Sequence, residues 1–449
     1  MTPSDTIFAL SSGHGVAGVA VLRLSGPAAL DALYALAGRQ DFKTRTATLV
    51  CLRDPSGGAL LDKALTLVFR APASFTGEDI VELHTHGGPA VVTGVLEALA
   101  NLPGLRAAEA GEFTRRAFEH GKMDLTEAEG LGDLLHAQTQ AQRSQALAQM
   151  DGTLRRLYEG WRSRLVGHLA HLEADIDFPD EDLPEGMAGA VAPAVAQLAA
   201  DMRDHLADNH RGERLRGGYR IVILGAPNVG KSTLMNHLAR SDVAIVSGEA
   251  GTTRDSIEVQ LNLGGFPVRL IDTAGVRSKD IGEVEAEGIR RSLQRAEEAD
   301  LRLILAPADA TMLDPETEAL LTPGSMLLFT KGDIGTRPTG IRSKHDLAGI
   351  YVISVKTGAG MEAFLAALAA HVRDAVAPRE APALTRIRHR KALEACVAHL
   401  ERFAANAGQD AVLVAEDIRM ASRALGTITG RIDVEDILDV VFSDFCIGK

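Results

Sequence analysis

Short apolar runs, punctuated by glycine and proline, fill the first 120 residues of the chain. Four of them have the length and residue types of strands, at 16–22, 46–51, 64–70 and 79–84. Two other stretches, 28–37 and 89–102, have the apolar spacing of helices. The pattern therefore predicts a small α+β or α/β domain over residues 1–120.

From residue 121 the apolar positions are spaced by three or four. They continue in this way from Leu147 to Leu172, which predicts one apolar stripe on a long helix. The acidic, proline-containing stretch 175–184 predicts a turn, and 191–210 predicts a second helix. A polar linker is expected at 211–218. We assign 121–216 to the first part of a helical domain.

Strand and helix signals alternate from residue 220 to 376, which is typical of a parallel sheet with crossover helices. We assign this domain to 217–378. After a linker with two prolines, at 377–382, the pattern predicts three terminal helices at 385–405, 412–425 and 434–442. They have little core of their own. We therefore expect residues 379–449 to pack with the earlier helices, so that the α/β domain is inserted into a helical one.

Composition narrows the class of protein. The 449 residues suffice for about three domains. With 47 Lys+Arg against 60 Asp+Glu, the net charge of −13 argues against a surface coated with phosphate-binding charge. Aromatic residues, at 4%, are too few for a broad base-stacking platform.

Cysteine usage and the N-terminus bear on the compartment. Three distant cysteines, Cys51, Cys396 and Cys446, disfavour a disulfide framework and a thiolate zinc site. The longest uncharged stretch, 6–22, is a poor bilayer span, and the N-terminus lacks the basic start of a secretion signal. We expect a cytoplasmic protein without a membrane partner.

The segment Gly225-Ala-Pro-Asn-Val-Gly-Lys-Ser232 matches the phosphate-loop pattern G-x-x-x-x-G-K-[ST]. It lies between a predicted strand, 220–224, and a predicted helix, 233–239. Its glycines let backbone N–H groups surround phosphate oxygens, and the helix N-terminus adds positive potential. We expect Lys231 to reach the β- and γ-phosphates as a catalytic residue and the Ser232 hydroxyl to ligate Mg²⁺.

Two later motifs complete the predicted phosphate side of the site. Gly251-Thr-Thr-Arg-Asp255 offers Thr253 as a second Mg²⁺ ligand, with Thr252 as the alternative. The strand ending in Asp272-Thr-Ala-Gly275 places Asp272 to hold a Mg²⁺-bound water and the Gly275 N–H to sense the γ-phosphate.

Two more motifs point to guanine. Thr330-Lys-Gly-Asp333 offers Asp333 as acceptor for two guanine ring donors, and Ser354-Val-Lys356 closes the base pocket. The set resembles the five motifs of Ras-like GTPases, although Thr330 replaces the commonest Asn and Val355 the usual Ala, so base affinity is expected to be modest. The residues expected to bind GTP are Asn228, Val229, Gly230, Lys231, Ser232, Thr233, Ser247, Gly248, Glu249, Ala250, Gly251, Thr252, Thr253, Asp272, Thr273, Ala274, Gly275, Thr330, Lys331, Asp333, Ser354, Val355 and Lys356.

Hydrolysis needs a group that orients water and a positive charge near the leaving phosphate. No Gln occurs between Val276 and Gln294, where a Ras-like enzyme has one. Asn228 could offer a side-chain oxygen to K⁺, which could replace the charge of an arginine finger. The alternative is that Asn228 is a tolerated loop residue.

Further motifs at both ends of the chain identify a family resemblance. They are Leu22-Arg-Leu-Ser-Gly26, Phe75-Thr-Gly-Glu-Asp-Ile-Val-Glu-Leu83, His86-Gly-Gly-Pro89, Arg116-Ala-Phe118, Lys122-Met-Asp-Leu125 and Cys446-Ile-Gly-Lys449. With the GTPase motifs they resemble the MnmE/TrmE family of tRNA uridine-modification GTPases, nearly end to end. The resemblance implies a multidomain α/β plus all-α fold. Its parts are an N-terminal α+β domain that binds tetrahydrofolate and dimerises, a discontinuous helical domain and an inserted Ras-like P-loop GTPase domain.

The resemblance also implies a function. Such proteins form homodimers and act with the FAD protein MnmG, in a heterotetramer or larger assembly, on tRNA. They add an aminomethyl or carboxymethylaminomethyl group at C5 of the wobble uridine. A 5-formyl- or methylene-tetrahydrofolate supplies the one-carbon unit, FAD belongs to the partner only, and GTP hydrolysis requires Mg²⁺ and is stimulated by K⁺.

Site residues follow from the resemblance by position. Folate binding falls on Arg23, Glu82, Lys122 and Lys449. The K⁺ ligands fall on Asn228, Ser247, Glu249 and Thr252. Glu285 matches the glutamate that positions the attacking water, with Glu283 as the competing assignment, and Arg254, Asp255 and Arg277 are expected in switch coupling or contacts between G domains. Cys446 is expected near the folate, either taking part in modification or chemically inert.

Other patterns have plainer readings. His84 and His86 share one face of a strand, but no further ligand lies in sequence reach, so a metal site is not expected. Two basic clusters are candidate tRNA phosphate contacts, although a solvated helix face is the commoner explanation. They are Arg155, Arg156, Arg162 and Arg164, and Arg386, Arg388, Arg390 and Lys391.

Two other functions stay open at this point. A regulatory GTPase of ribosome assembly would not bind folate. A membrane-remodelling GTPase would need a basic, strongly apolar amphipathic segment, and the sequence shows none.

Overall fold

The computed structural model describes residues 5–177, 187–245, 258–272, 297–310, 312–335, 345–377, 382–406, 411–432, 435–443 and 445–448. The chain forms two compact units. One comprises residues 1–132, 150–163 and 422–449, and the other comprises 133–149 and 164–421. The domain boundaries expected from the sequence stay predictions.

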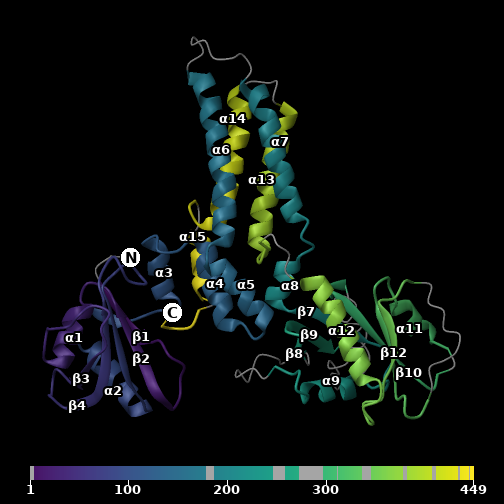
Figure 1. The fold of residues 1–449 in the computed structure, drawn as a ribbon, viewed down its shortest axis with the longest axis horizontal. Helices are drawn as coiled ribbons and strands as arrows, with labels where there is room; N and C mark the ends of the chain where they lie inside the picture. Colours follow the sequence, from purple (N-terminus) through teal and green to yellow (C-terminus); the bar gives the residue numbers. More distant parts are fainter. Residues whose placement is uncertain are drawn as a thin grey trace, which may run out of the picture. The chain divides into compact units, whose positions relative to one another are not determined.

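A six-stranded sheet forms the N-terminal part of the first unit (Figure 1). Its strands are β1 Thr6–Leu10, β2 Ala17–Ser25, β3 Thr48–Arg53, β4 Leu60–Phe69, β5 Ile80–Gly87 and β6 Leu105–Ala107, in the order β3-β4-β5-β2-β1-β6. Neighbouring strands are antiparallel except β1 and β6. The four predicted strands are confirmed, whereas β1 and β6, at five and three residues, were too short to stand out in the pattern.

The predicted helices of this region are also confirmed, as α1 Ala29–Ala37 and α2 Pro89–Ala100. Apolar side chains of both helices join those of the sheet in one core, which includes Leu33, Leu99 and Leu83. The sheet is therefore stable because its apolar face is covered, as an α+β domain requires.

The chain end packs within the same unit. Leu125 and Ala128 of α4 Leu125–His136 form a cluster with Leu438 and Phe442 of α15 Glu435–Ser443 and with Phe445. Ile447 forms an isolated β-bridge with Ala110, just before α3 Glu112–Glu119. The Ser11 hydroxyl donates a 2.8 Å hydrogen bond to the Gly448 carbonyl. These contacts hold residues 445–448 against the start of the chain.

The single helix expected across Leu147 to Leu172 is wrong. The structure has α5 Gln140–Met150 and α6 Thr153–Asp177, separated at Gly152, whose φ is 75°. A glycine in this left-handed conformation ends a helix. Leu147 is 43% exposed, whereas Leu154, Leu165 and Leu172 of α6 are buried, so the true stripe belongs to α6 alone.

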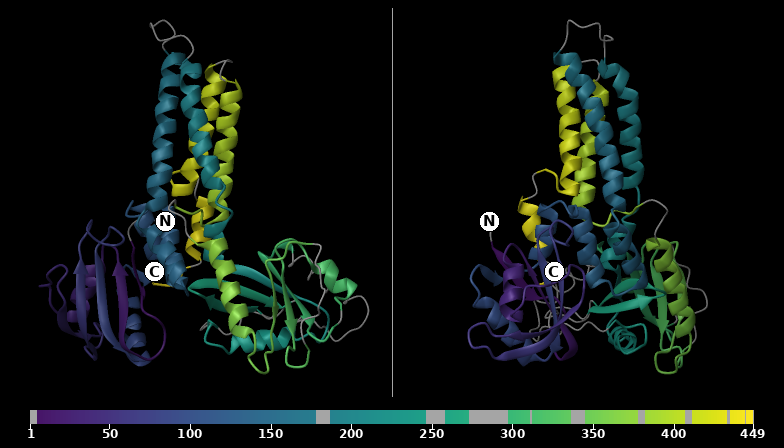
Figure 2. Two further views of the ribbon diagram at one scale, coloured as in Figure 1. Left: turned by 45° about the vertical axis from the view of Figure 1, so that its right-hand side comes forward. Right: turned by 60° about the vertical axis from the view of Figure 1, so that its left-hand side comes forward.

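Helices from both halves of the chain run side by side in the second unit (Figures 1 and 2). They are α7 Met187–Leu206, α13 Ile387–Asn406 and the parts of α6 and of α14 Ala411–Thr429 that belong to this unit. The Cys396 thiol of α13 lies 3.7 Å from the Met202 sulfur of α7, and Arg419 of α14 forms a 3.0 Å ion pair with Glu173 of α6. The C-terminal helices thus pack on the earlier ones, as expected.

The polar linker expected at 211–218 is also wrong. Residues Arg211–Gly217 form the short helix α8. Gly212 and Leu215 are buried, and a Cβ at Gly212 would come within 2.3 Å of the Leu384 carbonyl oxygen. The segment is therefore packed against distant parts of the chain and is not an exposed linker.

A second six-stranded sheet forms the α/β part of this unit. Its strands are β7 Tyr219–Leu224, β8 Glu258–Leu263, β9 Phe266–Asp272, β10 Leu301–Pro307, β11 Met326–Thr330 and β12 Gly349–Val352, in the order β12-β11-β10-β7-β9-β8. All neighbours are parallel except the edge strand β8. The described part of this region includes the helices α9 Lys231–Ala239, α11 Pro315–Leu320 and α12 Met361–Val376.

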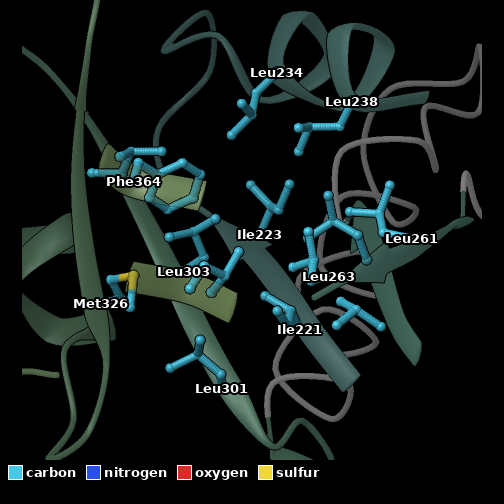
Figure 3. Close-up of a cluster of buried hydrophobic side chains, with 14 of the residues drawn as sticks. Ile221, Ile223, Leu234, Leu238, Leu261, Leu263, Leu301, Leu303, Met326 and Phe364 are labelled. Atoms are coloured by element: carbon cyan, nitrogen blue, oxygen red, sulfur yellow. The ribbon is translucent and has the colours of Figure 1, made fainter. Parts of the chain in front are cut away.

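Both α9 and α12 contribute to the core of this sheet. Figure 3 shows Ile221, Ile223 and Leu303 of the strands among Leu234 of α9 and Phe364 of α12. The predicted parallel sheet is confirmed. Because β7, β9, β10 and β11 are parallel, their carboxyl ends meet at one edge, where α/β proteins bind ligands.

None of the helices within the described ranges combines the length and apolarity needed to cross a bilayer.

Candidate functional site

The phosphate loop joins the end of β7 to the start of α9. Gly225 has a φ of 141°, and a Cβ there would lie 2.4 Å from the Leu305 carbonyl oxygen. Gly230, with a φ of 102°, caps the N-terminus of α9. Both positions therefore need glycine, the first for close approach to β10 and the second for its backbone conformation.

Lys231 points into this loop. Its side chain is buried, and its ammonium donates to the carbonyls of Gly225 and Ala226 at 2.6 and 2.8 Å. The charge is therefore held against the loop at the positive end of α9. A lysine ammonium and a helix N-terminus together form an environment suited to a phosphate group.

Two oxygen ligands meet beside Lys231. The Ser232 hydroxyl, in the first turn of α9, donates to a carboxylate oxygen of Asp272 at 3.3 Å. Asp272 ends β9 and is fully buried. Hydroxyl and carboxylate oxygens are the ligands that Mg²⁺ prefers, and these two fit a shared ion with its water.

Asp333 and Ser354 meet at the opposite end of the sheet edge. The buried Ser354 hydroxyl donates to Asp333 at 2.8 Å. This hydrogen bond is the main cause that lowers the pKa of Asp333, and the charge of Lys356 adds to it. The Ser354 hydroxyl therefore orients and stabilises the ionised carboxylate, which can accept from a ring N–H and an adjacent amino group.

Thr330 connects the phosphate loop with the part of the sheet edge where Asp333 and Ser354 lie. Its buried hydroxyl donates to the Val229 carbonyl, in the phosphate loop, at 2.5 Å. The residue that departs from the commonest motif thus links the end of β11 to the phosphate loop. Residue types alone gave no signal of this hydrogen bond.

A second group of predicted residues meets in the N-terminal sheet. Arg23 of β2 and Glu82 of β5 are directly opposite in the register, and Arg23 donates twice to one Glu82 oxygen, at 2.9 and 3.1 Å. His84 contacts the other oxygen at 3.3 Å. A cavity of about 200 Å³ opens beside this pair, with Phe69, Phe75 and Arg45 also in its wall.

Lys122 and Cys446, two further residues expected at the folate site, are not in the wall of this cavity. The Lys122 ammonium donates to the Pro72 carbonyl, next to the Ala73 wall of the cavity. The Cys446 thiol is exposed, in the segment held against Ala110 and Ser11.

Two family models match the chain, described as "GTP-binding protein TrmE N-terminus" over residues 6–122 and "MnmE helical domain" over residues 125–446. The chain is 54% identical over 447 residues to the "tRNA modification GTPase MnmE" of Parvibaculum lavamentivorans, covering 99% of this chain and 100% of that one. It is 46% identical to the rat mitochondrial "5-taurinomethyluridine-[tRNA] synthase subunit GTPB3", covering 100% of this chain and 94% of that one.

The chain belongs to the MnmE/TrmE family. Among solved structures, Era of Aquifex aeolicus bound to GDP·AlF4⁻ is 26% identical over 40% of this chain and 66% of that one, with a TM-score of 0.27.

Many residues predicted for an MnmE/TrmE protein lie outside the described ranges, and their roles stay predictions. They are Ser247, Gly248, Glu249, Ala250, Gly251, Thr252, Thr253, Arg254, Asp255, Thr273, Ala274, Gly275, Arg277, Glu283, Glu285 and Lys449. Of the predicted K⁺ ligands only Asn228 is described. It is exposed, with a φ of 62°, a conformation that asparagine tolerates in loops.

The solvated-face explanation for the second basic cluster is wrong for Arg390. This side chain is buried and pairs with Asp208 at 2.6 Å and Glu213 at 3.1 Å. Arg386 pairs with Asp133 at 2.9 Å. In the first cluster, Arg155 pairs with Glu127 at 3.2 Å and is more exposed. Arg386 and Arg390 thus form ion pairs within the fold of this MnmE/TrmE protein.

The histidine pair engages carboxylates. His84 contacts Glu82, and His86 contacts Asp62 through Nδ1 at 2.8 Å and its backbone N–H at 2.7 Å. Within the described part of the chain, no group of three or more His, Cys, Asp or Glu side chains could hold a metal ion.

Proposed function

We propose that this protein is a K⁺-stimulated GTPase that acts with the flavoprotein MnmG on the wobble uridine of certain tRNAs. It adds an aminomethyl or carboxymethylaminomethyl group at C5, with the one-carbon unit from a tetrahydrofolate. The coarser statement follows from family membership over the whole chain: the protein is a GTP hydrolase that takes part in tRNA modification, and tRNA is its substrate.

The arrangement of Lys231, Ser232 and Asp272 is the observation that supports GTP hydrolysis here. Lys231 and the N-terminus of α9 would stabilise the negative charge of the β- and γ-phosphates. Ser232 and Thr253 would ligate Mg²⁺, with Asp272 holding one of its water ligands. An ion bound there would neutralise phosphate charge. Asp333, held by the hydrogen bond from Ser354, would select guanine.

Glu285 is proposed to position the attacking water. Glu285→Ala should lower the hydrolysis rate strongly while GTP affinity changes little, because in the proposed role the side chain acts on the attacking water and not on the nucleotide. Glu283→Ala, two positions earlier, is the matched control. A rate loss in that variant alone would give the role to Glu283.

The cation role is proposed for Asn228 with Ser247, Glu249 and Thr252. Replacing KCl by NaCl at constant ionic strength should slow hydrolysis in wild type, and Asn228→Ala should remove the difference. Equal turnover in both salts would remove K⁺ from the proposal.

Folate binding is proposed for Arg23, Glu82, Lys122 and Lys449, in a cytoplasmic homodimer that pairs with MnmG. The cavity fits part of a folate, because Glu82 can accept from ring N–H groups and Phe75 offers an aromatic face. The Arg23 guanidinium is 5.7 Å from the Phe75 ring centre, which orders this wall.

Nucleoside analysis of tRNA from cells that lack this gene tests the function as a whole. Loss of the wobble uridine modification is expected, with restoration by wild type and not by Lys231→Ala. Normal modification without the gene would contradict the proposal. Titration with a reduced folate separates it from the ribosome-assembly GTPase, which would not bind folate.

A further inference from the structure

We propose that Arg45 is a further ligand-binding residue of the cavity beside Arg23 and Glu82, where it binds the carboxylate end of the folate. This inference rests on the proposed folate binding. The sequence motifs do not include Arg45, which lies between α1 and β3. The structure brings it into the wall of the same cavity as Arg23 and Glu82.

The cavity is unbalanced in charge. Its wall contains two guanidinium groups, of Arg23 and Arg45, and one carboxylate, of Glu82. Arg23 is paired with Glu82, and the side chains of both are less than one-fifth exposed. Among the residues that the structure describes, Arg45 has no carboxylate within ion-pair distance. One positive charge therefore remains for a ligand.

Arg45 is held in place by contacts that leave most of its donors available. Its Nη2 donates to the Ala73 carbonyl at 2.6 Å, and its guanidinium lies 5.4 Å from the Phe69 ring centre. Its backbone N–H donates to the Val68 carbonyl at 2.8 Å. A guanidinium has five N–H donors, so a planar carboxylate can still be bound by two of them.

Lys122 strengthens the same side of the cavity. Its ammonium donates to the Pro72 carbonyl, one residue before the carbonyl that Arg45 contacts. Two cations thus contact consecutive carbonyls of the segment that walls the cavity. The paired Arg23–Glu82 side suits a neutral polar ring, and the Arg45–Lys122 side suits an anionic group. This polarity predicts the orientation of a folate: ring toward Glu82, glutamate carboxylate toward Arg45.

Calorimetric titration of the full chain tests the assignment. The two ligands are 5-formyltetrahydrofolate and its diamide, in which both glutamate carboxylates are neutral carboxamides. Arg45→Ala should weaken binding of the folate about tenfold or more and change binding of the diamide less than about twofold, because only the folate loses a charge-assisted hydrogen bond. Arg45→Lys should retain part of the affinity.

Arg39→Ala is the matched control. Arg39 lies 5.4 Å from the Phe42 ring centre and is paired with Asp41 at 2.6 Å, so it resembles Arg45 but has its own carboxylate. No change in either affinity is expected. Thermal unfolding of each variant checks that it is folded.

Two outcomes would overturn the assignment alone: equal losses for both ligands in Arg45→Ala, which would mean that Arg45 only supports the wall, or no loss at all. A wild-type protein that binds neither ligand would overturn the proposed folate function and the assignment together.

Discussion

Thr330 shows how one hydroxyl joins two parts of a site. It ends β11, and its hydrogen bond to the Val229 carbonyl couples the base side of the sheet edge to the phosphate loop. A side chain that contacted only the base would not influence that loop. Threonine at this position, where asparagine is commonest, therefore still provides a hydrogen-bond donor to the phosphate loop.

Thr330→Val should weaken both the fold and nucleotide binding. Valine has nearly the shape of threonine but leaves the Val229 carbonyl without this donor, which costs about 1–3 kcal/mol of unfolding free energy. Urea unfolding and GDP titration measure the two effects. Thr330→Ser, which keeps the hydroxyl, is the control, and equal behaviour of the two variants would contradict the role given to this bond.

Asp124, directly before α4, has a carboxyl group with a raised pKa. Burial, aided by the charge of Glu127, raises its pKa to about 6, while Arg155 opposes the shift. Its Oδ1 accepts hydrogen bonds from Thr126 and from the Glu127 N–H, both at 2.8 Å, at the start of α4. The residue thus caps a helix in a place that disfavours its charge.

Asp124→Asn should change the pH dependence of stability. Between the ordinary pKa of 3.8 and about 6, the folded protein binds more protons at this position than the unfolded chain. The free energy of unfolding therefore falls as pH rises through this window. Asparagine keeps the helix cap and cannot ionise. The unfolding free energy of the variant, relative to that of wild type, should therefore rise by about 1–3 kcal/mol between the two ends of this pH window.

Unfolding titrations across that pH range measure this gain. Asp31→Asn, on the exposed face of α1, is the control and should follow wild type. A constant difference between Asp124→Asn and wild type at every pH would assign the effect to packing instead of ionisation.

At the scale of elements, Asp133 joins the end of α4 to two segments that are distant in the sequence. It lies in α4 and accepts from Arg216, at the end of α8, at 2.8 Å and from Arg386, just before α13, at 2.9 Å. Its side chain is 15% exposed. One carboxylate therefore holds the segments that enter and leave the α/β part.

Asp133→Ala should lower the free energy of unfolding by about 1–3 kcal/mol. This loss lies between those typical of exposed and of buried ion pairs, because the Asp133 side chain is partly exposed. The control is Glu401→Ala, which breaks the pair with Arg203, where both side chains are more than half exposed. That variant should lose less than about 1 kcal/mol. Equal losses in chemical unfolding would contradict a special role for Asp133.

Elements were predictable where periodicity and tertiary structure agree. The alternation after Arg220 gave the parallel sheet because strands buried on both faces are continuous apolar runs. Periodicity could not locate the break at Gly152, since apolar positions continue on both sides of it. It also could not predict α8, which is short and polar and packs at Gly212 against the distant Leu384.

The same contrast holds for the candidate site. Ser232 and Asp272 come from two motifs far apart in the sequence and lie in hydrogen-bond contact, because β7 and β9 are neighbouring parallel strands that end at the same sheet edge. Motif spacing could not show that Thr330 contacts Val229 or that Arg45 lines the cavity of Glu82, since both depend on loops packed in three dimensions. Arg390 was assigned to solvent because its carboxylate partners lie far away in the sequence.

At the scale of the whole molecule, the three cysteines report on folding. Cys51 and Cys446 are exposed, whereas Cys396 is buried in α13 and burial raises its pKa to about 12. Thiolates, not thiols, are the reactive form. Cys396 therefore becomes reactive only when its helix opens.

Iodoacetamide at neutral pH should modify two thiols of the native protein and the third only in denaturant, as mass spectrometry can count. Cys396→Ala should give the same native mass shift as wild type and no further addition on unfolding. Rapid triple modification of the native protein would contradict the burial of Cys396.

The close approach of Gly212 to Leu384 has a consequence for how the chain can be shortened. The backbone on either side of the α/β part returns to nearly the same point, so the intervening segment behaves as a cassette with adjoining ends. Chains tolerate the gain or loss of such a cassette at points where its ends are close together. A gene shortened between these two positions and closed by a short glycine-rich linker should therefore still encode a chain that forms the surrounding helices.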